Sequence, residues 1–256
     1  MFDIAVYRNS LKTEIFGKHI IVVDTVKSTN DAVIEFSKHN GVVLLANVQT
    51  NGRGRMGRTW YSNSEDNLYF SFIINNENIS MLPIIGILVA FSLFDILKVY
   101  GPFKIKWPND IVMSKKKLAG ILIETKIINN KLLYAVVGVG INVNAKSFPS
   151  EIKNIATSIY FVCKREVIRE ELLANFFNTF EDYLLTYKKS NIKIDIREKW
   201  IEASEYINKL VKMTTNGKTE YVIERGIDSD GALIVEDLTG NRKKIYYGDL
   251  LHVDGS

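Results

Sequence analysis

The residues best suited to binding chemistry share one stretch, Asn51-Gly52-Arg53-Gly54-Arg55-Met56-Gly57-Arg58-Thr59-Trp60. Glycine loses too much conformational freedom to favour a helix interior or a buried strand, so this composition predicts a binding loop. In an extended chain, Arg53 and Arg55 would point to the same side, roughly 7 Å apart. Two guanidinium groups on a backbone that glycine leaves bare suit a phosphate or a carboxylate.

Two other interpretations of this loop were weighed. Its glycines match the GxGxxG pattern of dinucleotide-binding folds. That pattern requires a helix opening directly after it and an acidic residue about twenty positions later. The residues that follow, 59–64, predict no amphipathic helix, which argues against a dinucleotide site. A solvated basic turn is the plainer alternative, and the loop alone does not decide between it and an anion site.

Polar side chains gather at three further places where a turn meets a regular element. Ser28 and Asp31 have the spacing of a capping box, so Ser28-Thr29-Asn30 either caps a helix or presents hydroxyl groups to a ligand. Lys106-Trp107-Pro108-Asn109-Asp110 is strong turn chemistry and could be a plain hairpin tip. Lys117 stands where a turn becomes a strand, which is also a common position for a solvated lysine.

The elements that carry these clusters alternate between strands and helices. Short strands are predicted at 20–24, 42–46, 68–74, 103–107, 117–124 and 132–139, and the strand at 68–74 should bury one face strongly. Helices are predicted from about Ser28, over 83–100, 167–187 and 195–204. The apolar run inside 83–100 is shorter than the roughly twenty residues that span a bilayer, so it predicts a core helix. Successive antiparallel strands beside helices predict an α+β fold with a mixed, largely antiparallel sheet.

Composition sets the broad class. The chain has 256 residues, 46% of them hydrophobic, and a net charge of +4, well short of the basic excess of a dedicated nucleic-acid binder. One cysteine, Cys163, excludes an intramolecular disulfide and favours a reducing, cytoplasmic setting. No metal-binding cluster is predicted from the three histidines and this cysteine.

Taken together and in order, the motifs resemble those of the biotin protein ligases. The family's glycine-arginine signature resembles residues 52–58, with Met56 where an arginine is often found, and residues 106–110, 117–122, 138–144 and 28–30 resemble four more of its motifs. The resemblance implies a class II synthetase-like catalytic domain, here expected over residues 1–208. Biotin's carboxylate would attack the α-phosphorus of ATP, with Mg²⁺, to give biotinyl-5′-AMP and pyrophosphate. A lysine of a biotin carboxyl carrier protein domain would then accept the biotin.

The resemblance also implies roles for individual residues. The catalytic residues would be Lys117, Arg55 and Arg53, with Lys117 holding the biotin carboxylate and the α-phosphate together. Biotin would contact Ser28, Thr29, Asn30, Gln49, Arg53, Gly54, Arg55 and Lys117. The adenylate would contact Arg55, Arg58, Trp60, Asn109, Asp110 and Asn142, and Mg²⁺ would arrive with ATP near Asp110 rather than in a protein cluster.

The last part of the chain predicts a separate small domain. Turn signals at 215–217, 228–231 and 239–241 separate five short strands, and the family carries a C-terminal SH3-like β-barrel, expected here over residues 209–256. Only about nineteen residues precede the first predicted strand, so no DNA-binding domain is expected. No membrane association is expected, and a homodimer is compatible with the resemblance. Lipoate ligation and non-enzymatic sensing are the alternative functions.

One prediction concerns motion of the loop. A loop of glycines and mutually repelling arginines should be poorly ordered from Arg53 to Arg58 until an anionic ligand bridges the arginines. Closing over the ligand would then shield the mixed anhydride from water.

Overall fold

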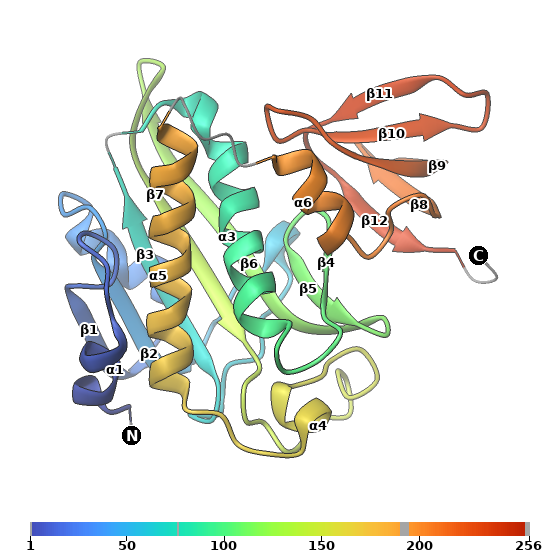
Figure 1. Ribbon diagram of the computed structural model, residues 1–256. Helices are drawn as coiled ribbons and strands as arrows, with labels where there is room; N and C mark the ends of the chain where they lie inside the picture. The colour runs from blue at the N-terminus through green and yellow to red at the C-terminus, as the bar shows by residue number, and fades with distance from the viewer. Residues whose placement is uncertain (1, 76, 190–194, 254–256) are drawn as a thin grey trace.

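In a computed structural model that describes residues 2–75, 77–189 and 195–253, a seven-stranded sheet organises the larger part of the chain (Figure 1). The strand order is β1-β2-β3-β7-β6-β5-β4, and only β1 and β2 run parallel. The strands are β1 Ile20–Val26, β2 Val43–Gln49, β3 Leu68–Ile74, β4 Lys104–Lys106, β5 Asp110–Met113, β6 Lys116–Ile128 and β7 Lys131–Ile141. The predicted α+β class and the mixed, largely antiparallel sheet are confirmed.

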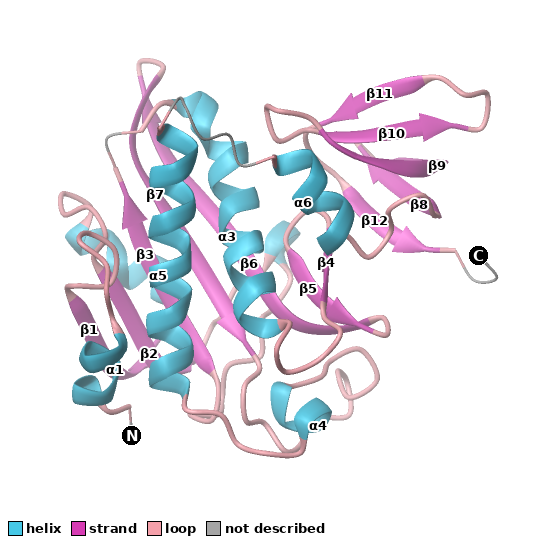
Figure 2. Cartoon of the chain, viewed as in Figure 1, coloured by secondary structure: helices cyan, strands magenta, loops and turns pink. Residues whose placement is uncertain are grey.

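Two long helices cover one face of this sheet, α3 (Leu82–Leu97) and α5 (Arg169–Lys188) (Figure 2). Phenylalanines of β3 and α5 interlock with T-shaped ring contacts, as Phe70 does with Phe176 and Phe177 at 5.3 and 5.6 Å between centroids. Ring pairs in this geometry stabilise a core beyond the area they bury. This core fixes the sheet whose opposite face and edge carry the polar clusters.

The stretch Ile79–Leu97 has the length and apolar composition of a membrane span. Here it is the core helix predicted from the sequence, because most residues of α3 are buried and it packs against α5. The helix ends at Leu97 rather than at Tyr100.

Short helices cover the other face of the sheet, and another lies near the N-terminus. Helix α2 (Thr29–Ala32) continues into the 3-10 helix η1 (Val33–Phe36), and both pack on β3. The predicted one-sided burial of β3 is therefore wrong: all seven of its residues are buried, because helices lie on both faces. The sequence interpretation also missed α1 (Ile4–Ser10), which Asp3 caps with its side chain and which packs on α5.

The last described part of the chain forms a five-stranded antiparallel sheet in the order β11-β10-β9-β8-β12. Its strands are β8 Leu210–Thr215, β9 Lys218–Ile227, β10 Leu233–Asp237, β11 Arg242–Ile245 and β12 Asp249–His252. The number of strands agrees with the prediction. Helix α6 (Ile196–Ala203) connects the two sheets and contacts β9, and α4 (Ile159–Cys163) and the 3-10 helices η2 (Arg55–Gly57) and η3 (Ile79–Met81) complete the elements.

Candidate active site

Two cavities meet at the edge where the polar clusters come together. The smaller has a volume of about 420 Å³ and the larger about 1230 Å³. Four residues line both cavities and so mark their junction: Gly54, Trp60, Asn109 and Lys117. Every residue predicted for the site lines one cavity or both.

The division between the cavities follows the predicted division between ligands. Only the smaller cavity is lined by Ser28, Thr29, Asn30, Gln49 and Arg53, which were assigned to biotin. Only the larger cavity is lined by Arg55, Arg58, Asp110 and Asn142, which were assigned to the adenylate. Arg55 was expected at both ends and is found at the larger one.

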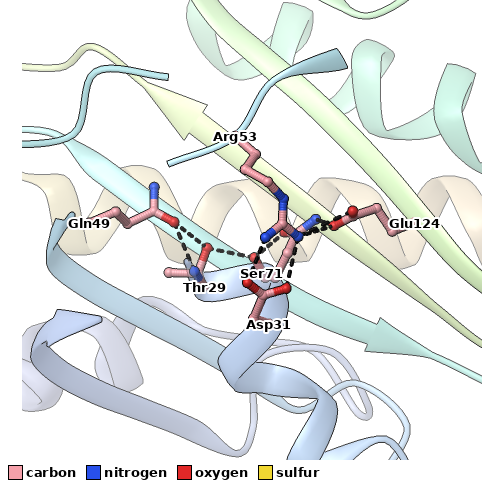
Figure 3. Close-up of polar contacts among 7 residues, drawn as sticks. Thr29, Asp31, Gln49, Arg53, Ser71 and Glu124 are labelled. Atoms are coloured by element: carbon pink, nitrogen blue, oxygen red, sulfur yellow. Dashed lines mark hydrogen bonds and ion pairs between the residues drawn. The ribbon is translucent and has the colours of Figure 1, made fainter. Parts of the chain in front are cut away.

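A continuous hydrogen-bond network organises the smaller cavity (Figure 3). The backbone N–H and the hydroxyl of Thr29 donate to Gln49 Oε1 at 2.8 and 3.1 Å, and Gln49 Nε2 donates to Ser62 Oγ at 2.9 Å. Ser71 Oγ lies 2.7 Å from Thr29 Oγ1 and 2.6 Å from Asn30 Oδ1. The side chains are therefore fixed before any ligand arrives, in a pocket rich in donors and acceptors.

The structure decides whether Ser28 caps a helix or faces a ligand. It occupies the N-cap position of α2, yet its side chain makes no capping hydrogen bond. The capping-box interpretation is wrong because Asp31 pairs with Arg53 instead of closing the box. The Ser28 hydroxyl is buried and lines the smaller cavity, where it is placed for a ligand.

Lys117 occupies the junction of the two cavities. Its Nζ lies 2.7 Å from Asp110 Oδ1 and 5.1 Å from the centroid of the Trp60 ring. Its backbone is fastened on both sides, since its N–H donates to Ile155 O and its carbonyl accepts from Thr157. The ammonium group is thus held between a carboxylate and an aromatic face, within reach of both cavities.

Two glycines of the 138–144 motif make room for site residues. A Cβ at Gly138 would lie 2.0 Å from Asn30 Oδ1, and a Cβ at Gly140 would lie 2.4 Å from Trp60 Nε1. Neither distance is possible for a real side chain. These positions therefore admit only glycine if Asn30 and Trp60 are to keep their places.

The Trp60 indole N–H is an unsatisfied donor. It is buried, and within the described residues it has no hydrogen-bond partner. A buried donor without a partner costs about 1 to 3 kcal/mol, which a ligand with an acceptor at this point would recover.

The arginines of the loop do not act as one pair. Arg53 binds Asp31 and Glu124, whereas Arg55 lies 3.3 Å from Gly248 O and 3.5 Å from Asp249 Oδ1. The prediction that Arg53 and Arg55 share a side is wrong, because the extended backbone ends at Gly54 and η2 begins at Arg55.

Mutual repulsion is likewise the wrong description of the loop. Arg58 donates to Asp249 at 2.5 Å, and Arg53 and Arg55 also have carboxylate partners. Order without ligand therefore depends on these ion pairs, and the predicted disorder from Arg53 to Arg58 stays a prediction.

Asparagine side chains support the larger cavity. Asn109 Nδ2 donates to Ile121 O at 2.7 Å, and Asn142 Nδ2 donates to Thr157 O at 3.0 Å. Asn144, in the same motif as Asn142, makes two bonds with Val167 and fastens the chain before α5.

Several lining residues of the larger cavity were not predicted. Asp249 and Leu251 come from β12, and Ile152, Ile155 and Ala156 come from the segment between β7 and α4. Asp249 follows an ordinary Tyr-Gly turn, so nothing local in the sequence signals that it reaches the arginines.

No metal cluster is evident among residues 2–75, 77–189 and 195–253. No group of three or more histidine, cysteine, aspartate or glutamate side chains comes together there. Asp110 is a carboxylate on the wall of the larger cavity and could contribute one ligand to a Mg²⁺ that phosphate oxygens also hold.

Comparison with known proteins identifies the family. A model of the "Biotin/lipoate A/B protein ligase family" matches residues 22–142, and one of the "Biotin protein ligase C terminal domain" matches residues 206–253. The bifunctional ligase/repressor BirA of Bacillus spizizenii is 32% identical over 95% of this chain and 77% of its own length. The chain belongs to the biotin protein ligase family.

Other relatives agree along most of the chain. The biotin–[acetyl-CoA-carboxylase] ligase of Mycobacterium tuberculosis is 27% identical over 95% of this chain and 94% of its own. Among solved structures, the biotin protein ligase from Aquifex aeolicus in complex with biotin and ATP is 32% identical, covers 91% of this chain and 98% of its own, and has a TM-score of 0.76. The fold of this chain is therefore shared with a biotin protein ligase over 91% of its length.

Proposed function

We propose that the smaller cavity holds biotin, that the larger holds ATP, and that Lys117 joins the reacting atoms at their junction. The activity of the family is the ATP-dependent ligation of biotin to a lysine of a biotin carboxyl carrier protein domain, through biotinyl-5′-AMP. The observation that carries the assignment is the pair of cavities with Lys117, Trp60, Asn109 and Gly54 on the wall between them.

The first step needs positive charge at the junction. A carboxylate oxygen of biotin forms a bond to the α-phosphorus, and the bond from that phosphorus to the bridging oxygen of pyrophosphate breaks. Lys117 Nζ lies between the cavities and can contact both the carboxylate and an α-phosphate oxygen after it leaves Asp110. A fixed cation placed where negative charge accumulates stabilises the transition state.

The biotin end offers hydrogen bonds suited to a ureido ring. Ser28, Thr29, Asn30 and Gln49 supply hydroxyl and amide groups in a buried pocket. A ligand that failed to pair with a donor or acceptor left open by the network would bind less tightly by about 1 to 3 kcal/mol for each. This favours biotin over lipoate, which has no ureido group.

The nucleotide end combines cations with an aromatic face. Arg55 and Arg58 line the larger cavity and would contact phosphate oxygens in exchange for Asp249. The unsatisfied Trp60 N–H would donate to the adenylate, and Asn109, Asp110 and Asn142 line the larger cavity. Mg²⁺ bound with ATP would neutralise part of the phosphate charge.

Three finer features belong to the proposal. The chain would work in the cytoplasm, where carrier domains accept biotin and where Cys163 stays reduced. It would act as a ligase without a DNA-binding function, and the homodimer stays an expectation from the resemblance. The division into a catalytic part at 1–208 and a C-terminal part at 209–256 is proposed with them.

The direct test uses pyrophosphate release and the mass of a carrier domain. With ATP and Mg²⁺, biotin should drive both the release and the mass gain of one biotinyl group, and lipoate should drive neither. Lys117→Ala should lower the rate at least about a hundredfold, because a charge at the reacting atoms is lost. Lys115→Ala, an exposed lysine on the adjacent turn, is the matched control and should keep the wild-type rate.

The outcomes separate the candidate functions. Biotin binding without pyrophosphate release would make the chain a sensor, and release driven by lipoate would make it a lipoate ligase. Full activity of Lys117→Ala would remove Lys117 from the centre of the mechanism while leaving the ligase function in place.

A further inference from the structure

Arg53 lines the smaller cavity and bridges two carboxylates, Asp31 and Glu124 (Figure 3). Its guanidinium donates to both oxygens of Asp31, at 2.5 and 2.8 Å, and to both oxygens of Glu124, at 3.2 and 3.0 Å. The pairing with Arg53 lowers the pKa of Asp31. The planar guanidinium is thus engaged on two sides and connects α2, the glycine-arginine loop and β6.

Glu124 has a second partner, Asn30. The Nδ2 group of Asn30 donates to Glu124 Oε2 at 2.6 Å. An ionised carboxylate only accepts hydrogen bonds, so the amide nitrogen of Asn30 must face Glu124 and its oxygen must face Ser71. Glu124 therefore fixes which way the Asn30 amide points.

This orientation passes along the network to the ligand pocket. Asn30 Oδ1 can only accept, and it lies 2.6 Å from Ser71 Oγ, so the single hydroxyl proton of Ser71 is directed to it. Thr29 Oγ1, 2.7 Å from Ser71 Oγ, then receives no proton from Ser71, so its own proton is shared between Ser71 Oγ and Gln49 Oε1. Its remaining lone pairs are left for whatever enters the cavity.

We propose that Asp31 and Glu124 are positioning residues for the biotin end of the site. Arg53 would bridge these two carboxylates and would not contact the phosphates. The inference rests on the proposed function, in which the smaller cavity holds biotin. It adds two carboxylates that the sequence did not predict for the site, and it moves Arg53 out of the catalytic role predicted for it.

The arrangement around α2 explains why such a bridge is useful. Helix α2 has four residues, and the Ser28 side chain does not cap it. Two residues of the smaller cavity, Thr29 and Asn30, belong to this short element, and a third, Ser28, directly precedes it. Arg53 fastens its Asp31 to the loop and to β6, so the bridge holds the donors and acceptors of the cavity in place.

Arg55 provides the contrast within the same loop. It lines the larger cavity, and its partners are Asn109, Gly248 and Asp249. Arg53 lines the smaller cavity only, and its partners are Asp31 and Glu124. The two arginines should therefore affect different substrates.

The test compares Glu124→Gln and Arg53→Lys with wild type. A glutamine at 124 brings a donor group against Arg53 or against Asn30 in either orientation of its amide. A lysine at 53 keeps the charge but cannot bind two carboxylates with a planar fork. Calorimetric titration of biotin without ATP should give a dissociation constant at least about tenfold higher for both variants. The KM for ATP at saturating biotin should stay within about twofold.

The matched control is Asp24→Asn. Asp24 accepts from Asn47 at 3.0 Å, which is the same kind of contact outside both cavities, and this change should leave biotin binding at the wild-type value. Asp31→Asn is a second variant at an exposed position, and it should weaken biotin binding severalfold.

Each result decides the proposal. Raised dissociation constants for biotin with an unchanged KM for ATP support the bridge. A raised KM for ATP with unchanged biotin binding would place Arg53 on the phosphates and overturn it, as would wild-type values for all the variants. A wild-type protein that binds no biotin would instead overturn the proposed function, and that result is visible before any variant is measured.

Discussion

At the scale of single residues, Trp60 links the two halves of the site. It lines both cavities, and Lys117 Nζ lies 5.1 Å from the centroid of its ring. Gly120 and Gly140 leave room for that ring. Its indole N–H is the unsatisfied buried donor of the site within the described residues. The polar end of this side chain is therefore kept for a ligand, while its rings are packed.

Trp60→Phe separates these two parts of the side chain. Phenylalanine keeps an aromatic ring beside Gly140 but has no N–H to donate to the adenylate. We expect the KM for ATP in pyrophosphate release to rise about tenfold, which is typical for a lost hydrogen bond to a charged group. Biotin binding without ATP should change by less than about threefold. Tyr221→Phe, at an exposed position in β9, is the control. An unchanged KM for ATP would show that the N–H has no ligand.

At the scale of elements, β7 makes room for two residues of the site at alternate positions. Gly138 and Gly140 are two positions apart, so they lie on the same face of the strand. Gly138 leaves space for Asn30 at the smaller cavity, and Gly140 leaves space for Trp60 at the junction. The space for two side chains of the site thus depends on two glycines of one strand.

Alanine at each glycine should affect a different substrate. A Cβ at 138 would displace Asn30, so Gly138→Ala should raise the dissociation constant for biotin at least about tenfold with a smaller change in the KM for ATP. Gly140→Ala would displace Trp60 and should raise the KM for ATP most. Titration with each substrate checks both expectations.

Gly86→Ala is the control for this pair. A Cβ there meets only Ile123 Cδ1 at an ordinary 3.5 Å, and alanine in a helix is favourable by up to about 1 kcal/mol. The same substrate losing affinity in both cavity variants would contradict the division along β7.

Most elements could be predicted from hydrophobic periodicity, because the core decides them. The strand at 68–74 and the helices at 167–187 and 195–204 agree with β3, α5 and α6 within two residues. The burial of both faces of β3 could not be predicted, because it depends on α2 and η1 packing from behind. The site motifs were identified because they are contiguous in the chain.

At the scale of the whole molecule, one buried carboxylate sits between the two sheets. Glu224 of β9 accepts from Trp200 Nε1 at 2.8 Å and from Ser204 Oγ at 2.5 Å, while its Oε2 has no hydrogen-bond partner in the described chain. Burial raises the pKa of Glu224 to about 7, partly offset by these donors and by Lys209, with Glu205 adding to the rise.

The free energy of unfolding should therefore fall as the pH rises from about 4.5 to about 7. The unfolded carboxyl ionises near pH 4.5 and the folded one only near 7, so the contribution is complete below about 4.5 and lost by about 7. A difference of this size corresponds to about 3 kcal/mol. Urea unfolding at pH 5 and pH 8 should show a loss for wild type that is largely absent in Glu224→Gln.

Glu151→Gln, at an exposed position, is the control and should keep the wild-type pH dependence. The comparison uses the change with pH, because the glutamine also alters buried hydrogen bonding equally at both values. An equal pH dependence in wild type and Glu224→Gln would mean that Glu224 is ionised in the folded protein throughout.

The contacts that the C-terminal sheet makes with the rest of the chain could not be predicted from the local sequence. Asp249 is 191 residues from Arg58 and Glu224 is 24 from Trp200, and neither belongs to a recognisable motif. Such pairings depend on where the C-terminal sheet packs, which no local pattern encodes. The pairing of Asp31 and Glu124 with Arg53 could not be predicted for the same reason, since charged residues on a helix and a strand are ordinary at the surface.

The division of the site into two cavities has an evolutionary consequence. Five of the residues proposed for the acid line only the smaller cavity, four of those proposed for the nucleotide line only the larger, and the junction residues line both. Substitutions in the first group can therefore change which acid is accepted while the activation machinery is inherited intact. A single family that includes ligases for both biotin and lipoate is what such a modular site would produce.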